Sequence, residues 1–157
     1  MSVIACYARV APSEFAALND QGFDPDTWDE EFDRFDGEGR TADIDQAHEA
    51  LDAVLRAHGI AVPVVYAGRP VPDTVIGYGP VVLVAPDEVA AAASALASRE
   101  AETAITADSV SGTAGIGPVD DWASAEGLDY LRTAYRSLAA LYTAANASHQ
   151  LVLMTMQ

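Results

Sequence analysis

The sequence predicts an α+β domain in which a small β-sheet is flanked by several helices. Apolar, strand-like segments occur near the start, the middle and the end of the chain, and segments with apolar residues at helical spacing separate them. Half of the 157 residues are hydrophobic, which is enough material for a core. The chain shows no internal repeat, long linker or sign of a second core, so residues 1–157 are expected to form a single domain.

The first strand and the first helix follow each other directly. Residues 2–11 are apolar, β-branched and aromatic, which is typical of a strand. A short helix is expected over residues 14–19, after Pro12, with Ser13 as its cap.

An acidic amphipathic helix is predicted over residues 24–36. Asp24 suits the N-cap, and Pro25 suits the first helical position. Trp28, Phe32 and Phe35 follow at spacings of four and three residues and therefore share one face. The rest of this helix carries the acids Asp26, Asp29, Glu30, Glu31 and Asp33.

The central segment, residues 41–59, has the clearest helical pattern. Thr41 or Asp43 is expected to cap its start, and Gly59 stands where a C-cap glycine belongs. Its apolar stripe consists of Ile44, Ala47, His48, Leu51, Val54, Leu55 and His58.

Residues 60–80 are rich in proline and glycine, and they contain either a short strand at 62–66 or a structured loop. The apolar run 81–84 predicts a buried strand, and an alanine-rich helix is expected over 88–100. Glycines favour a loop over most of 103–121.

A second clear helix and a last strand complete the pattern. The helix is predicted over residues 127–148, and the strand over residues 150–156. One side of this helix carries Leu128, Leu131, Tyr135, Leu138, Leu141 and Tyr142.

The charge of the chain excludes several classes of function. The formal net charge is −16, and all eight basic residues are arginines. Binding to DNA, RNA or an anionic membrane needs clustered basic side chains, so none of these is an expected partner. A basic protein partner is electrostatically favourable, whereas the simpler alternative is that the charge serves only solubility.

Cys6 is the single cysteine and lies in an apolar run, so it is expected to be a small core residue rather than a nucleophile. A single thiol forms no disulfide within the chain. The sequence also shows no signal peptide and no apolar stretch long enough for a membrane span. We therefore expect a cytoplasmic protein.

No metal or cofactor site is predicted. The acidic run fails as a calcium loop, because Trp28 and Phe35 stand where ligands are needed. His48 and His58 are ten residues apart, which is not the spacing of a metal site, and His48 is expected to be a hydrogen-bonded core or boundary residue. The glycine-rich run 112–117 has the wrong spacing for a phosphate loop and predicts a turn.

The segment Gly77-Tyr78-Gly79-Pro80 is the most specific local signal. Two glycines around a tyrosine, directly before a buried strand, predict a strained turn. Tyr78 is expected to pack on the core, and the alternative is a rigid loop that lines a pocket. In that alternative, Arg69 and His48 are the candidate polar groups of the pocket.

Three motifs resemble those of the YfbM-like bacterial family, a domain of unknown function (1877): Gly68-Arg69-Pro70-Val71, Gly77-Tyr78-Gly79-Pro80 and Pro86-Asp87-Glu88-Val89. Residues 43–47 resemble the opening of that family's central helix. The resemblance spans nearly the whole chain and implies a small α+β fold with no established activity. Relatives typically carry an aromatic residue and histidines in this helix, whereas this chain has His48, Glu49 and Asp52.

The leading functional hypothesis is a non-enzymatic binding protein that acts through an acidic surface, as an immunity protein or antagonist does. The partner would be a basic protein, contacted by Asp29, Glu30 and Asp33. The alternative is a small-molecule-binding protein or enzyme with a pocket near Tyr78, Arg69 and His48. A third hypothesis is a homo-oligomer that packs through the alanine-rich helix. No catalytic set is recognisable in the sequence, so a non-enzymatic role is favoured.

Overall fold

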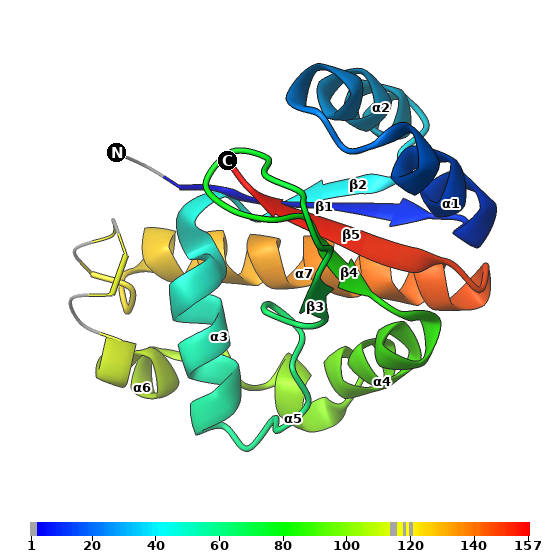
Figure 1. Cartoon of the computed structure of the whole chain (residues 1–157). Helices are drawn as coiled ribbons and strands as arrows, with labels where there is room; N and C mark the ends of the chain where they lie inside the picture. The colour runs from blue at the N-terminus through cyan, green and yellow to red at the C-terminus, as the bar shows by residue number, and fades with distance from the viewer. Residues whose placement is uncertain (1–2, 114–115, 118, 120) are drawn as a thin grey trace.

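The computed structural model describes residues 3–113, 116–117, 119 and 121–157, and it places one β-sheet between two layers of helices (Figure 1). Within these residues the sheet has five strands in the order β2-β1-β5-β4-β3, and all neighbouring strands are antiparallel. The predicted α+β class is confirmed. The strands are β1 (Ala5–Val10), β2 (Thr41–Asp43), β3 (Arg69–Pro70), β4 (Val82–Val84) and β5 (Leu151–Met156).

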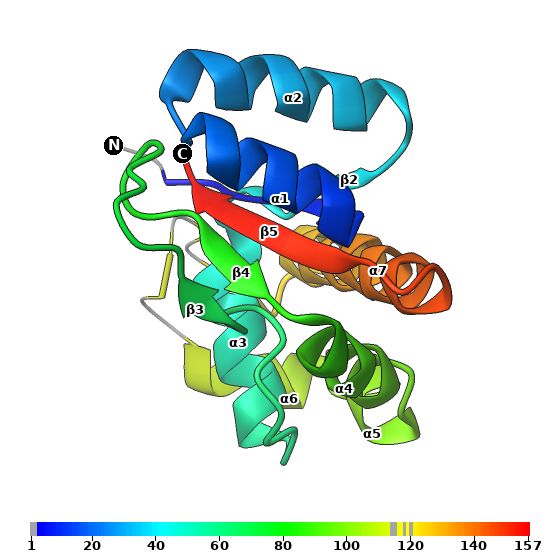
Figure 2. The same cartoon turned by 45° about the vertical axis from the view of Figure 1, so that its right-hand side comes forward.

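Helices cover both faces of the sheet. On one face lie α1 (Pro12–Gln21) and α2 (Pro25–Gly37), and α2 contacts β1 and β2 (Figures 1 and 2). The long helix α7 spans the other face beneath β1 and β2, and the shorter helices surround it. This second layer consists of α3 (His48–Ala57), α4 (Pro86–Leu96), α5 (Arg99–Glu102), α6 (Ala107–Val110) and α7 (Ala125–Ala147).

The alternation of side chains along β1 divides the core in two. Tyr7 points to the α7 side, whereas Ala8 and Val10 point to the α1–α2 side. All three are buried: Tyr7 joins one hydrophobic cluster, and Ala8 and Val10 join the other. The expectation of one core is therefore corrected, because one sheet with two covered faces buries two clusters.

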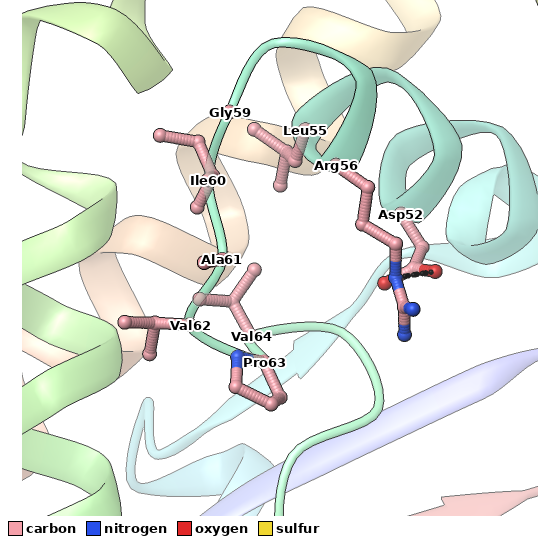
Figure 3. Close-up of a pocket in the computed structure, with 9 residues that line it drawn as sticks. All are labelled: Asp52, Leu55, Arg56, Gly59, Ile60, Ala61, Val62, Pro63 and Val64. Atoms are coloured by element: carbon pink, nitrogen blue, oxygen red, sulfur yellow. Dashed lines mark ion pairs between the residues drawn. The ribbon is translucent and has the colours of Figure 1, made fainter.

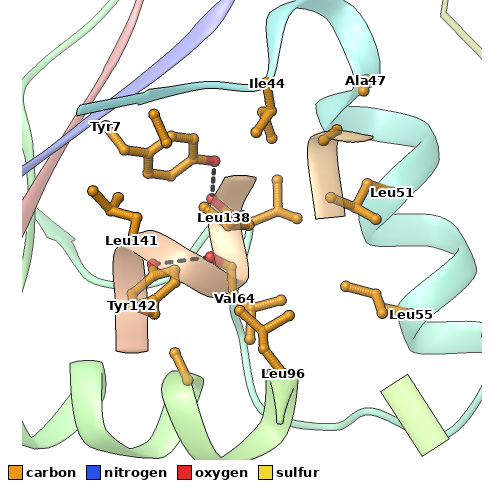
Figure 4. Close-up of a cluster of buried hydrophobic side chains, with 14 of the residues drawn as sticks. Tyr7, Ile44, Ala47, Leu51, Leu55, Val64, Leu96, Leu138, Leu141 and Tyr142 are labelled. Carbon is orange, nitrogen blue, oxygen red and sulfur yellow. Dashed lines mark hydrogen bonds between the residues drawn. The ribbon is translucent and has the colours of Figure 1, made fainter. Parts of the chain in front are cut away.

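The segment that precedes β3 is a loop, so the strand suggested at residues 62–66 is wrong and the alternative of a structured loop holds. The loop first runs past the end of α3 (Figure 3). The buried hydroxyl of Tyr7 then donates a hydrogen bond to the carbonyl oxygen of Val65 at 2.8 Å, and the hydroxyl of Tyr142 donates to that of Val64 at 2.9 Å (Figure 4). These side chains satisfy carbonyls that a strand would pair with a neighbour.

The central helix starts later than the sequence predicts. Thr41–Asp43 pairs with β1 as an edge strand, a single 3-10 turn follows at Asp45–Ala47, and α3 begins only at His48. Neither Thr41 nor Asp43 caps α3. The carboxylate of Asp43 instead accepts the Asp45 N–H at 2.6 Å and turns the chain from the strand into the helix.

Two other helix predictions need correction. Ser13 lies inside α1, and the cap position is Ala11, whose N–H is bound by the Glu14 carboxylate at 2.9 Å. The helix expected over residues 88–100 is divided into α4 and α5, because Ser98 caps the second one through the Ala101 N–H. Within the part of the chain that the structure describes, none of the helices has the length and hydrophobicity that a membrane span requires.

Candidate functional site

The helix α2 presents opposite faces to the sheet and to solvent. Trp28 and Phe35 are fully buried against the sheet, and the Asp24 side chain caps the helix by accepting the Thr27 N–H at 3.0 Å. The predicted cap and apolar face are thus confirmed. The other side carries exposed acids at spacings of three and four residues, which we call the α2 acidic face: Asp26, Asp29, Glu30 and Asp33.

Two arginines, Arg34 and Arg40, hold α2 against α1 and the segment after α2 through ion pairs. Arg34 binds Glu31 at 2.5 Å and Glu14 of α1 at 3.2 Å. Arg40 binds Glu14 at 2.5 Å and Glu38 at 2.8 Å. Both guanidinium groups also lie over the Phe35 ring, at 4.6 and 4.7 Å from its centre.

This network leaves the α2 acidic face without a counter-charge. The nearby cations Arg34 and Arg40 bind Glu14, Glu31 and Glu38. The carboxylates of the α2 acidic face take part in no ion pair among the described residues. A rigid, uncompensated row of negative charge therefore faces solvent.

Replacing Glu14 with glutamine is expected to destabilise the fold by about 1–2 kcal/mol at pH 7, because it removes the ion pairs with Arg34 and Arg40. The loss stays this small because water screens partly exposed ion pairs. The hydrogen bond from Arg40, followed by those from Ala11 and Arg34, lowers the pKa of Glu14 from 4.5 to about 2. The stabilisation is fully present above pH 4.5 and is lost as the pH falls through about 2. Urea unfolding of both proteins between pH 7 and pH 2 measures the difference.

The matched control for this experiment is Glu30→Gln, which removes an exposed carboxylate from α2 that forms no ion pair in the described structure. We expect it to change the free energy of unfolding by less than about 0.5 kcal/mol. Equal effects of the two substitutions, or a Glu14 effect that does not shrink in acid, would contradict the role given to Glu14.

His48 is held inside the protein at the start of α3. Its Nε2–H donates to the carbonyl oxygen of Val3 at 3.1 Å, and its Nδ1 accepts the hydroxyl of Tyr66 at 2.7 Å. Burial, with the nearby charges of Glu49 and Asp52, raises the pKa of Tyr66 to about 12, so this hydroxyl remains a donor. The prediction of a hydrogen-bonded core or boundary histidine is confirmed.

A hollow of about 260 Å³ lies at the end of α3 (Figure 3). Leu55 and Val64 line it together with the loop 59–63, and Asp52 and Arg56 stand on one side. These two charged side chains bind each other at 2.8 Å. The polar groups of this hollow are therefore already paired, and the rest of its side chains are apolar.

Tyr78 is presented to solvent. The Tyr78 N–H donates to the Met156 carbonyl oxygen at 2.8 Å, which fixes the turn against β5, yet the side chain is 52% exposed. The expectation that the ring packs on the core is wrong: Tyr78 lies at the tip of the turn that Gly77 permits with a φ of 61°, and its side chain joins neither cluster. Val75 of the same loop is also exposed.

Arg69 lies in the edge strand β3 and lines a different hollow, of about 350 Å³. Phe15 and Asn19 of α1, Leu83 of β4 and residues 70–72 complete its lining. Neither Tyr78 nor His48 lines this hollow, so the structure does not gather the three predicted pocket residues here. Phe15 and Asn19 carry no motif, and only the packing of α1 beside β4 brings them to Arg69.

Cys6 is a buried residue of β1, as predicted. Burial, followed by the charges of Asp43 and Asp45, raises the pKa of its thiol to about 12. The thiol is therefore protonated at neutral pH and is a poor nucleophile.

The described residues contain no group of three or more histidine, cysteine or acidic side chains that are placed to hold a metal ion. The turn predicted at residues 112–117 lies partly outside the described residues, because 114 and 115 are not among them; Ser111–Thr113 forms a single 3-10 turn.

The fold and these surfaces define an α+β protein with a helix-covered antiparallel sheet and an exposed acidic helix. The family model described as domain of unknown function (DUF1877) matches residues 1–155, so the chain belongs to this family. The crystal structure of a protein of unknown function, YfbM from Escherichia coli, is similar: 16% sequence identity, a TM-score of 0.61, and coverage of 98% of this chain and 99% of that chain. No curated protein matches the chain. The YfbM-like resemblance is thereby confirmed.

Proposed function

We propose that this protein is a non-enzymatic binding protein whose α2 acidic face binds a basic segment of another protein. One observation carries the proposal: four exposed carboxylates stand on one side of a fastened helix, with no cation paired to them in the described structure. Water solvates these charges in the free protein, and arginine or lysine side chains of a partner would neutralise them.

The rigidity of α2 supports this function. Trp28 and Phe35 fix the position of the helix, and the contacts of Arg34 and Arg40 fix its orientation. A surface that is already ordered loses little entropy on binding, which favours affinity. The net charge of −16 also attracts a basic partner over a distance.

An acidic helix of this kind suits a protein that covers the basic site of another protein, as an antagonist or immunity protein does. We infer a cytoplasmic location, in keeping with the free, buried thiol of Cys6. The same charge disfavours nucleic acids and anionic membranes as partners.

The test is a comparison of affinity captures from the native host at several salt concentrations. The variant combines Asp29→Lys, Glu30→Lys and Asp33→Lys. A matched control combines Glu100→Lys, Asp108→Lys and Asp129→Lys, which makes the same change of charge at exposed acids on other helices. We expect wild type and control to retain a basic partner that the α2 variant loses, and salt to weaken that capture.

The captured partner is then purified, and its dissociation constant is measured directly with the three proteins. The α2 variant is expected to bind at least about 100-fold more weakly, since close charge pairs at an interface are each worth well over 1 kcal/mol. Equal affinity of the two triple variants, or affinity that does not change with salt, would exclude the α2 acidic face as the binding site.

A further inference from the structure

The sheet extends beyond the helices that cover its α1–α2 face. Figure 2 shows α1 over the β1–β5 side of the sheet, with β4 and β3 beyond it. One cross-strand row of residues runs from the part of the sheet beneath α1 to the part that α1 does not cover. In this row Ala8 pairs with Leu153, Leu153 with Leu83, and Leu83 with Arg69. Ala8 and Leu153 are fully buried, Leu83 is half-buried, and Arg69 is exposed. The hollow that Arg69 lines lies where this row emerges from beneath α1.

The hollow combines one cation with apolar walls. Phe15 stands on the α1 side, Leu83 belongs to the sheet, and Pro70 and Pro72 lie on the β3 side, while Asn19 adds an amide. Its volume of about 350 Å³ matches a small ligand.

Arg69 differs from the other arginines that line hollows. Arg9, Arg34 and Arg56 each bind a side chain of this protein. Arg69 takes part in no ion pair or side-chain hydrogen bond among the described residues, although the chain contains 24 acidic residues. Its guanidinium is available to an external anion.

The backbone around Arg69 is held in place. Gly68 has a φ of 89°, and a Cβ at this position would lie 2.3 Å from the Leu83 carbonyl oxygen, so the chain passes close against β4. The Val71 N–H donates to the Val81 carbonyl oxygen at 2.8 Å, and the neighbouring prolines restrict the chain further. The backbone that carries the Arg69 side chain is therefore held in place before any ligand arrives.

We propose that this hollow binds a small monocarboxylic acid with an apolar body. The carboxylate pairs with the guanidinium of Arg69, which offers two parallel N–H donors, and the body packs on Phe15 and Leu83. A single arginine balances one negative charge. Phosphates and polyanions carry more charge than Arg69 neutralises, and the net charge of −16 repels them more strongly.

Calorimetric titration with three probes tests the chemistry. Phenylacetate has both the charge and the apolar body, phenylacetamide has the body without the charge, and acetate has the charge without the body. We expect phenylacetate to bind at least about tenfold more tightly than either of the others. Its binding should shift the backbone NMR signals of Phe15 and Leu83.

Arg69→Gln tests the site, and Arg99→Gln is the control, because Arg99 is an exposed arginine on α5. Arg69→Gln should weaken phenylacetate binding about tenfold with an unchanged melting temperature, and the control should bind as wild type. Absence of phenylacetate binding at millimolar concentration overturns the proposal. Equal binding of the acid and its amide, equal binding by the Arg69 variant, or signal shifts confined to the α3 hollow overturn it as well.

Discussion

Replacing Trp28 with alanine is expected to lower the free energy of unfolding by about 3–5 kcal/mol, because this is the cost of removing a large buried aromatic side chain. The ring of Trp28 is fully buried between α2 and the sheet. It contacts Phe23 and Phe32, whose ring centres lie 6.1 and 5.8 Å away. Urea unfolding at pH 7 measures the loss.

Trp28→Phe separates the volume of the side chain from its polar atom. The Nε1–H of Trp28 is buried and has no hydrogen-bond partner within the described structure, which is an unfavourable state for a donor. Phenylalanine leaves a smaller cavity than alanine and removes this donor. We therefore expect Trp28→Phe to cost less than about 1.5 kcal/mol. A cost below about 1 kcal/mol for Trp28→Ala would show that the ring does not fasten α2.

Replacing Gly77 with alanine is expected to destabilise the protein by about 2–4 kcal/mol, through backbone strain and a steric clash together. Gly77 has a φ of 61°, a backbone conformation that residues other than glycine rarely adopt. An added Cβ would lie 2.3 Å from the backbone oxygen of Met156. The turn would have to move away from β5, and the hydrogen bond from the Tyr78 N–H to Met156 would be lost.

Gly79→Ala is the matched control, two residues away in the same turn. A Cβ at Gly79 would meet no atom within 4 Å, and its φ is not positive. We expect this substitution to change stability by less than about 0.5 kcal/mol, or to stabilise slightly by restricting the unfolded chain. Thermal and urea unfolding of the pair measure the contrast. Similar stabilities of the two variants would show that the close approach to β5 is not needed.

Elements fixed by local chemistry were predictable from the sequence. Asp24 followed by Pro25 marks the start of α2, and the spacing of Trp28 and Phe35 identifies its buried face. The strand at Thr41–Asp43 was not predictable, because its residues continue the helical pattern of α3 and only the unpaired edge of β1 makes them a strand. The loop before β3 likewise depends on hydroxyl groups that are distant in sequence, from Tyr7 and Tyr142.

The candidate sites show the same division between local and non-local information. The exposed acids of α2 follow from helical periodicity, and their lack of ion pairs follows from how Arg34 and Arg40 fold back on Glu14. Arg69 was recognisable as a polar residue in a rigid loop. Its hollow was not, since Phe15 and Leu83 are brought together by the packing of α1 beside β4 and the order of the strands.

The central position of the β1–β5 pair has a consequence for how the chain acquires its structure. Val10 pairs with Leu151, and Ala5 with Met156, so the middle of the sheet joins segments that are made at very different times during translation. Pairing across so long an intervening segment slows folding, since the entropy of closing the loop is lost before the stabilising contacts between the strands form. Until β5 leaves the ribosome, β1 has only β2 to pair with, and the sheet-facing side of α7 has an incomplete surface to cover.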